Sequence, residues 1–355
     1  MSIKVGVIGA SFARAAFLPA LATINEAEVV AIASQRLESA KSAGDEFGVP
    51  EAYDDWQAML ASHDLDLVCI ATPTDTHAPM ALAALESGAH VLCDKPMAMN
   101  SEESAAMLEK ADSLGRIHMI DHELRFNPNR RKIQELIEGG AIGKVKHLNI
   151  VNISAALSDP SSKSEGDWWM LEERGGGRMG ASGSHQIDLI RFWLGNVVSA
   201  NGVVETMVPN RIDKASGNAW TATADDFTRF TLKMESGALA TVLISGAARH
   251  GVGSSTQIFG SEGTIFLSDN DEKLLVAKAG EDFQDQSVSD PNEGLEGVGS
   301  GIWNVSVVSL MRELISAISE HRNLNWGATF EDGLRCQEVM DAVRRSSTER
   351  RWIDL

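Results

Sequence analysis

Short apolar runs alternate with amphipathic segments from Ile3 to Asp121. The runs are nearly continuous in apolar residues, which is typical of parallel strands buried on both faces. They predict strands at Ile3–Ile8, Val29–Ala33, Leu67–Ala71, His90–Cys93 and Ile117–Ile120. The segments between the strands have the pattern of crossover helices. They predict helices at Ala15–Ile24, Leu37–Phe47, Trp56–Ser62, Met80–Ser87 and Glu102–Leu114, the last capped by Asn100 with Glu103. This part of the chain therefore predicts a doubly wound, parallel α/β sheet.

The pattern changes after a predicted linking helix, Pro128–Glu138. Short turns that contain glycine now separate neighbouring apolar runs, which is typical of antiparallel hairpins. One predicted hairpin pairs Phe227–Met234 with Ala238–Ser245, and a second pairs Gln257–Phe259 with Thr264–Leu267. We therefore expect an α+β region built on a large open, mostly antiparallel sheet.

The last quarter of the chain predicts a long loop followed by helices. Glu281–Gly301 is acidic, rich in Gly and Ser and poor in apolar residues, so we expect a surface loop there. Helices are predicted around Val305–Glu320 and Phe330–Thr348. The length of 355 residues agrees with two domains, which we place at 1–122 and 123–355, with the final helix able to pack back on the first domain.

Composition argues against several partners. The chain has 31 Lys+Arg against 50 Asp+Glu, and a net charge of −19 repels phosphate backbones and anionic lipid. We therefore expect no nucleic-acid partner, and no membrane partner because apolar stretches stay shorter than the ~18 residues of a span. A strand begins at Ile3, which predicts no signal peptide. Cys69, Cys93 and Cys336 lack metal-ligand spacing, so we expect buried thiols in a reducing cytoplasm and no metal site.

The first strand runs into Gly9-Ala10-Ser11-Phe12-Ala13-Arg14. A small residue in such a turn lets the backbone approach a pyrophosphate. The match to G-x-G-x-x-G is poor, because Ser11 takes the second position and either Arg14 or, in a loop one residue shorter, Ala13 takes the third. A plain strand-to-helix turn is the alternative, but the strand–turn–helix context favours a dinucleotide site that includes Gly9, Ser11, Phe12 and Ala13.

The end of the second strand predicts the cofactor. A carboxylate there would bind the ribose 2′-hydroxyl of NAD, but the chain has Ser34-Gln35-Arg36 instead. A hydroxyl and a guanidinium without a repelling carboxylate suit a 2′-phosphate, so NADP(H) is favoured, with NAD(H) as the alternative. The alternative interpretation of Arg36 is a solvated residue at a helix start.

Two further strand ends carry polar groups. One ends in Thr72-Pro73-Thr74 with His77 close behind, and the next ends in Asp94-Lys95-Pro96. Ligands of open α/β sheets bind at this carboxyl edge. Because the proline biases the conformation of the residue before it, the Lys95 ammonium is expected to have a defined direction. The alternative is a lysine whose charge lies in water.

Several longer segments resemble the Gfo/Idh/MocA oxidoreductase family. They are ATPTDTHAPMALAALESGAHVLCDKPMAMN, LRFNP, IEGGAIGKV, GGGRMGASGSHQIDLIRFWLG and FEDGLRCQEVMDAVRRSS, in the expected order over nearly the whole chain. Asp94 stands where the family usually has Glu. The resemblance implies a Rossmann domain, a C-terminal domain with a large open sheet, and a homodimer or homotetramer formed through that sheet.

The resemblance also implies roles for single residues. Lys95 would be the active-site lysine that contacts the nicotinamide ribose and the substrate oxygen, and His185 would transfer a proton. Asp188, one helical turn on, would orient a charged partner or else pair with Arg191. The family usually has an aspartate four residues before the histidine, but this chain has Ala181.

With Ala181 at that position, the proton relay must differ, be supplied by other groups, or be absent. Candidates are Asp121-His122-Glu123, of which His122 is the strongest, and His77 is expected near the cofactor or as a helix cap. The pair Trp168-Trp169 could wall the nicotinamide or a sugar ring, although plain packing is the more common role of such aromatics.

Together these features predict an NADP(H)-dependent oxidoreductase that acts on a carbohydrate, cyclitol or related polyol. Two alternatives remain open on the sequence. One is a nucleotide-sensing regulator of the same fold without turnover, which Ala181 favours and Lys95 with His185 oppose. The other is a lyase, glycosidase or transferase cycle that uses transient oxidation by bound cofactor.

Overall fold

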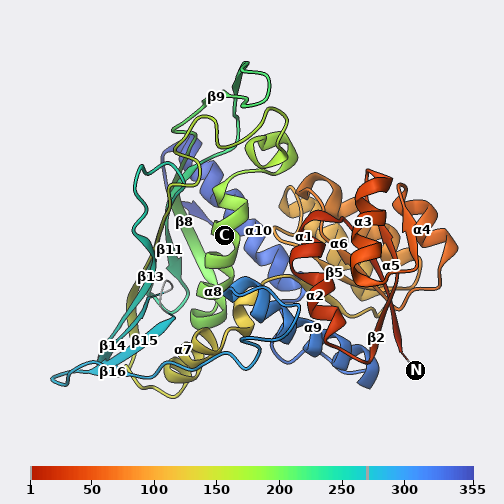
Figure 1. Ribbon diagram of the computed structural model, residues 1–355. Coiled ribbons are helices and arrows are strands. Elements are labelled where there is room, and N and C mark those ends of the chain that lie inside the picture. Colours follow the sequence, from red (N-terminus) through yellow and green to blue (C-terminus); the bar gives the residue numbers. More distant parts are fainter. Residues whose placement is uncertain (1, 269–271) are drawn as a thin grey trace. The chain divides into compact units, whose positions relative to one another are not determined.

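The computed structural model describes residues 2–268 and 272–355, which divide into two compact units (Figure 1). The first unit is Met1–Asn127 with Asp290–Arg335, and the second is Pro128–Ser289 with Cys336–Leu355. The sequence-based division into 1–122 and 123–355 differs in two respects: the first unit extends to Asn127, and it also contains Asp290–Arg335.

The first unit contains a parallel sheet of six strands among its described residues, in the order β3-β2-β1-β4-β5-β6. The strands are β1 (Ile3–Ile8), β2 (Ala27–Ala33), β3 (Glu51–Tyr53), β4 (Leu67–Ile70), β5 (His90–Cys93) and β6 (His118–Ile120). The predicted doubly wound sheet is thereby confirmed. The sequence pattern missed β3, which is short and lacks an apolar run. Strand order reverses between β1 and β4, which in such sheets opens a crevice at the carboxyl ends of the strands.

Helices connect these strands close to the predicted ranges. They are α3 (Leu37–Phe47), α4 (Trp56–Ser62), α5 (His77–Glu86) and α6 (Ser101–Ser113). The Asn100 cap is confirmed, because its side-chain oxygen accepts a hydrogen bond from the Glu103 backbone N–H at 2.9 Å.

The single helix predicted at Ala15–Ile24 is wrong. The structure has α1 (Ser11–Ala15) and α2 (Phe17–Ala22), separated at Ala16. Pro19 has no N–H to give to the Ala15 carbonyl, so a continuous helix cannot form there. The Asn304 side chain donates to the Ala15 carbonyl instead, at 2.6 Å.

Apolar clusters cover both faces of the sheet, because successive strand residues point to opposite sides. Leu67 and Cys69 belong to one cluster, whereas Val68 and Ile70 belong to the other. The first cluster also contains buried residues of α9 (Ile302–Glu320). This packing explains why 290–335 lies with the first unit.

Helix α9 is, among the described residues, long and apolar enough to cross a membrane by length and composition alone. Sequence reasoning missed this property because Arg312 and Glu313 interrupt its apolar run. More than half of the helix is buried inside the protein, as in many core helices, so it is weak evidence for a membrane span.

The second unit contains a sheet of nine strands in the part of the chain that the structure describes, in the order β16-β15-β14-β13-β7-β12-β11-β8-β17. Only β7 and β12 pair in parallel there, so the predicted mostly antiparallel sheet is confirmed. The strands are β7 (Val145–Ile153), β8 (Val197–Glu205), β11 (Phe227–Met234), β12 (Leu239–Ser245), β13 (Gly253–Gly260), β14 (Gly263–Ser268), β15 (Lys273–Lys278), β16 (Gln284–Asp285) and β17 (Ile353–Asp354). Both predicted hairpins are present.

Helices of the second unit lie along one face of this sheet (Figure 1). They are α7 (Pro128–Glu138), α8 (Ser184–Leu194) and the larger part of α10 (Phe330–Glu349). The fully buried Ser346 of α10 accepts a hydrogen bond from the Gly202 N–H of β8 at 3.0 Å. A separate ribbon pairs β9 (Asn210–Ile212) with β10 (Ala219–Thr221).

The loop predicted at Glu281–Gly301 is mostly exposed, but it is anchored. Asn292 is fully buried, and its side chain donates to the Val305 carbonyl at 3.1 Å and to the Ser309 hydroxyl at 2.8 Å. Arg312 donates to the Asn292 side-chain oxygen at 2.6 Å. The compositional signal for a loop does not reveal a single buried amide of this kind.

Candidate active site

Gly9, which follows β1 in the predicted dinucleotide turn, lies very close to the backbone of Ala71. Its φ is +102°, and its N–H donates to the Ala33 carbonyl of β2 at 2.8 Å. A Cβ on Gly9 would lie 2.1 Å from the carbonyl oxygen of Ala71, which follows β4. The ends of β1, β2 and β4 can therefore meet only because this residue is glycine. Ala13 is fully buried, as a small residue required for close packing would be.

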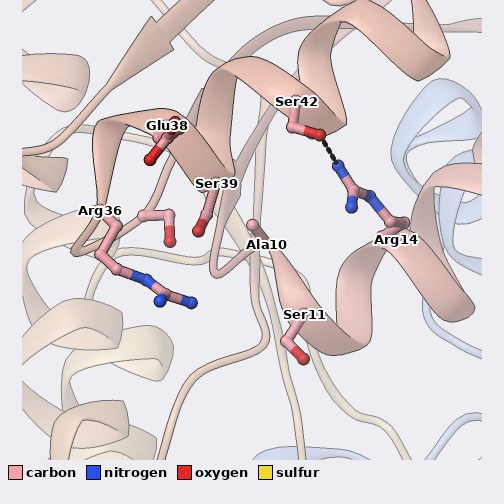
Figure 2. A pocket seen from close by; sticks show the side chains of 8 residues that line it. Ala10, Ser11, Arg14, Arg36, Glu38, Ser39 and Ser42 are labelled. Carbon is pink, nitrogen blue, oxygen red and sulfur yellow. Dashed lines mark hydrogen bonds between the residues drawn. The ribbon is translucent and has the colours of Figure 1, made fainter.

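A cavity of about 410 Å³ lies beside this turn in the first unit (Figure 2). Figure 2 shows the Arg36 guanidinium and the Ser39 side chain pointing into the same space. Arg14 also lines the cavity, but its guanidinium is engaged by the Ser42 hydroxyl at 2.8 Å and by the Glu46 carboxylate at 2.9 Å. The lining consists of Ala10, Ser11, Arg14, Ser34, Arg36, Glu38, Ser39 and Ser42.

The donors in this cavity fit the phosphate and ribose groups of a dinucleotide. Guanidinium and hydroxyl groups are donors for phosphate oxygens, and Ser11 and Ser34 are among the predicted cofactor residues. Gln35 and Phe12 are among the predicted cofactor residues that do not line the cavity. Gln35 is exposed, and the Phe12 ring packs edge-on against Phe17 with ring centroids 5.3 Å apart.

His77 joins the loops that follow β4 and β5. Its ring is buried, with Nδ1 2.9 Å from the Pro96 carbonyl and Nε2 2.8 Å from the Thr72 carbonyl. A neutral imidazole can donate to one of these carbonyls, and a protonated ring donates to both. His77 begins α5, but its side chain does not cap that helix. It therefore fixes the spacing of the strand-end segments that contain Thr72, Pro73 and Thr74 on one side and Pro96 on the other.

Lys95 is held in a shielded position rather than in water. Its side chain is 12% exposed, and its Nζ lies 3.9 Å from Oδ1 of Asp94. The same carboxylate oxygen accepts a hydrogen bond from the Lys95 backbone N–H at 2.7 Å. The peptide bond between Lys95 and Pro96 is cis. The alternative of a solvated lysine is therefore wrong, because the Asp94 carboxylate and burial together restrict the ammonium.

Buried acids follow β6 at the same edge of the sheet. Asp121, His122 and Glu123 are all at most 2% exposed. Burial, together with the Asp94 charge, raises the pKa of Asp121 well above its usual range, and the Lys95 charge opposes this shift. Burial and the Asp121 charge raise the pKa of Glu123 in the same way. Three consecutive polar residues directly after a buried strand were the sequence signal for this cluster.

His185 and Asp188 are both buried on α8 in the second unit. The turn before this helix is π-helical, η5 (Met179–Gly183), and it contains Ala181. The Asp225 carboxylate accepts a hydrogen bond from the Met179 N–H at 2.9 Å, and burial raises the pKa of Asp225 to about 6. Sequence reasoning missed Asp225, because its contact with the start of α8 is long-range and leaves no local pattern.

Trp168 and Trp169 lie in a short 3₁₀ turn, η3 (Trp168–Met170), with their ring centroids 5.1 Å apart. Trp169 is 36% exposed, and the Lys163 ammonium lies 5.7 Å from its ring centroid. An exposed aromatic face of this kind can stack on a sugar ring. The wall role therefore stays a prediction.

Three of the remaining histidines make structural contacts. His90 Nδ1 accepts from the Ile117 N–H and His118 Nδ1 from the Phe330 N–H, at 2.8 and 2.9 Å. His147 stacks on Phe259. Within residues 2–268 and 272–355, no group of three or more His, Cys, Asp or Glu side chains is placed to hold a metal ion. Cys69, Cys93 and Cys336 are buried free thiols.

Comparison with known protein families matches two regions of the chain. Residues 3–122 match the family described as "Oxidoreductase family, NAD-binding Rossmann fold", and residues 130–266 match the "GFO/IDH/MocA C-terminal domain".

Curated relatives and a solved structure cover most of the chain. Levoglucosan dehydrogenase of Pseudarthrobacter phenanthrenivorans is 27% identical over 351 residues, covering 91% of this chain and 88% of that protein. Myo-inositol 2-dehydrogenase of Thermotoga maritima is 28% identical over 277 residues, covering 77% of this chain and 78% of that protein. The structure of a levoglucosan dehydrogenase in complex with NADH and levoglucosan has a TM-score of 0.90 and 26% identity, covering 100% of this chain and 99% of the other.

Proposed function

The chain belongs to the GFO/IDH/MocA oxidoreductase family, whose N-terminal domain binds NAD, and we propose that it is an NADP(H)-dependent dehydrogenase of a sugar, cyclitol or related polyol. The observation that carries this proposal is the restricted ammonium of Lys95 at the carboxyl edge of the parallel sheet, where ligands of such sheets bind.

The substrate class is supported by what the relatives act on. Their names specify levoglucosan, a D-glucoside and myo-inositol, all of which are ring compounds rich in hydroxyl groups. A hydroxyl or carbonyl oxygen of such a ring is a natural partner for the Lys95 ammonium.

The nicotinamide cofactor, when bound, supplies the hydride acceptor or donor. The residues of this chain bind, orient and move a proton around that transfer. Lys95, oriented by Asp94, polarises the substrate oxygen and stabilises negative charge on it. His185 is proposed to exchange a proton with a substrate hydroxyl, for which an imidazole is suited near neutral pH.

NADP(H) is proposed over NAD(H) because of the cavity beside the β1–α1 turn. Arg36 lines this cavity with Ser34 and Ser39, and Figure 2 shows its guanidinium on the cavity side. A guanidinium with neighbouring hydroxyls is a strong receptor for a doubly charged 2′-phosphate. Glu38 adds a carboxylate to the lining, so a ribose hydroxyl of NAD(H) is the competing ligand of the same space.

The cofactor is tested by titrating NADP⁺ and NAD⁺ into the wild type and into Arg36→Ala. Loss of a charged hydrogen bond costs about 1.5–3 kcal/mol, so the variant should bind NADP⁺ roughly 10- to 150-fold more weakly and NAD⁺ nearly unchanged. Lys41→Ala removes a positive charge from α3 outside the cavity lining and should change neither affinity. Tighter binding of NAD⁺ than of NADP⁺ by the wild type would overturn the preference.

The reaction is tested with a panel of sugars, keto-sugars and inositols with both cofactors. We expect turnover with at least one polyol, and Lys95→Ala should retain cofactor affinity but lose most of kcat, since acid–base and charge-stabilising groups contribute about 10²-fold or more. Turnover by Lys95→Ala at the wild-type rate across a pH series would refute the assigned role. Substrate consumption without a net change in nicotinamide absorbance would favour a transient-oxidation cycle instead.

A homodimer or homotetramer formed through the nine-stranded sheet is a further proposal, together with a cytoplasmic location. Alternate residues of β11, such as Phe230 and Leu232, are fully buried, whereas Phe227 and Thr231 on the other face are partly exposed. A mixed apolar and polar face of this kind suits self-association. Sedimentation of the wild type and of a Thr231→Lys variant would measure the oligomeric state of each.

A further inference from the structure

Arg14 lines the cofactor cavity but has no role in the NADP(H) site as described so far. It lies in the last turn of α1, directly after the buried Ala13. The G-x-G-x-x-G fingerprint has a small residue near this point, so a long cationic side chain departs from that pattern. Figure 2 shows the Arg14 and Arg36 guanidinium groups on opposite sides of the cavity.

Two residues of α3 orient the Arg14 guanidinium. Its Nη2 donates to the Ser42 hydroxyl at 2.8 Å, and its Nε lies 2.9 Å from Oε2 of Glu46. A guanidinium carries five N–H groups, and two of them are on Nη1. Within the described ranges 2–268 and 272–355, Nη1 has no acceptor. Arg14 is therefore held at the cavity through part of its donor set, and the other donors are available to a ligand.

The charges that line the cavity favour a second arginine ligand. A phosphate monoester carries about 1.5 to 2 negative charges at neutral pH. With Arg36 alone, a 2′-phosphate would face one positive charge and the Glu38 carboxylate. With Arg14 the lining offers two positive charges, and its serine hydroxyls add further donors. The lining is thus positive in balance, although the whole chain has a net charge of −19.

We propose that Arg14 is a second ligand of the 2′-phosphate of NADP(H), opposite Arg36, and that Glu46 moderates its attraction for that phosphate. This inference rests on the proposed function. The Glu46 carboxylate offsets part of the guanidinium charge while it holds the side chain in place. The side chains of Arg14 and Glu46 are 38% and 52% exposed, so their ion pair is weak enough for the guanidinium to turn toward a ligand.

The alternative is a purely structural role, in which Arg14 only connects α1 to α3 through Glu46. Loss of such a connection would disturb the turn at Ser11 and would weaken every adenine nucleotide alike. Loss of a phosphate ligand would weaken only those nucleotides that carry a phosphate on the 2′ oxygen. The two roles therefore differ in their effect on the ratio of two affinities.

The test compares adenosine 5′-monophosphate with adenosine 2′,5′-bisphosphate, which differ only in the 2′-phosphate, by isothermal titration. We expect the wild type to prefer the bisphosphate. Arg14→Gln should lower the affinity for the bisphosphate roughly tenfold and that for the monophosphate by less than about twofold, because one charged hydrogen bond is lost. Glu46→Gln should raise the bisphosphate affinity about two- to fivefold, since the amide oxygen can still accept from Nε but carries no charge.

Lys110→Gln is the matched control, because Lys110 forms an ion pair of similar exposure with Glu86, at 2.8 Å, outside the cavity lining. It should shift the urea midpoint as little as Arg14→Gln does and leave both nucleotide affinities unchanged. An equal loss of both nucleotides in Arg14→Gln would show a structural role only.

Arg36→Gln separates this inference from the proposed function. We expect it to lower the preference for the bisphosphate, as Arg14→Gln does. A preference that is lost in Arg36→Gln but survives in Arg14→Gln would overturn this inference alone. Equal wild-type affinities for the two nucleotides would overturn the proposed choice of NADP(H), and this inference with it.

Discussion

Replacing Gly9 by alanine is the sharpest test of the turn that leads from β1 into the cofactor cavity. The added Cβ would lie 2.1 Å from the carbonyl oxygen of Ala71 and 2.6 Å from its carbonyl carbon. Both are backbone atoms, so no side chain can move aside. The Ala71 N–H also donates to the Ile8 carbonyl at 2.7 Å, which resists any shift of Ala71 away from β1.

The expected cost of Gly9→Ala follows from these contacts. A non-glycine residue at a φ of +102° costs about 1–2 kcal/mol. Forcing extra volume into a closed backbone site costs about another 1–3 kcal/mol, and weakening the Ala71 hydrogen bond adds about 1 kcal/mol. We therefore expect unfolding to become easier by about 3–6 kcal/mol.

A matched control separates backbone conformation from the clash. Gly48, the C-cap of α3, has a φ of +70°, but a Cβ there would meet nothing within 4 Å. Gly48→Ala should therefore lose only the conformational part, about 1–2 kcal/mol. Urea unfolding of both variants, followed by circular dichroism, measures the difference in their free energies of unfolding. Fluorescence titration with NADPH measures their affinities for the cofactor.

Gly9→Ala should also weaken NADPH binding at least tenfold, because relief of the clash displaces the turn beside Ser11, whereas Gly48→Ala should bind normally. Equal urea midpoints and equal NADPH affinities for the two variants would refute the reasoning. In that case the approach of β1 to β4 would not depend on the absence of a side chain.

Two further predictions concern the second unit. Because folding raises the pKa of Asp225 to about 6, its contribution to stability is full below its ordinary value of 3.8 and is lost as pH rises through 6. Asp225→Asn, which can still accept from the Met179 N–H, should abolish this loss, which is about 2 kcal/mol between denaturation curves at pH 4 and pH 8. Ser346→Ala should cost about 1–3 kcal/mol in urea unfolding, since the Gly202 N–H loses its acceptor inside the protein, whereas Ser113→Ala at an exposed helix end should cost almost nothing. A pH-independent difference between wild type and Asp225→Asn, or equal unfolding of the two serine variants, would contradict them.

Sequence periodicity located the parallel strands well, because both faces of these strands are buried and their residues must be apolar throughout. His90–Cys93 and Leu37–Phe47 agree with β5 and α3 to the residue. The same reasoning failed at Ala15–Ile24. The helix breaks there because Pro19 has no N–H to donate to the Ala15 carbonyl, which accepts from the distant Asn304 side chain instead. It also missed β3, since a three-residue edge strand has too few positions to show a period.

Candidate site residues could be chosen from the sequence for a related reason. The carboxyl ends of parallel strands share one edge, so the polar residues that follow them, Thr72, Asp94 and Asp121, are expected to be neighbours. The burial and the contacts of these residues could not be predicted in this way. The shielding of Lys95, the burial of Asp121 and the two carbonyl contacts of His77 depend on packing from distant parts of the chain.

The sequence by itself determined the alternating α/β pattern, the hairpins of the second sheet and the positions of the lysine and histidine motifs, because local periodicity and turn chemistry encode these features. Only the tertiary structure decided that α9 completes the core of the first unit and that Arg36 lines a cavity. It also placed a fully buried aspartate next in register to the lysine motif. These outcomes depend on contacts between residues far apart in the chain, and no local pattern records such contacts.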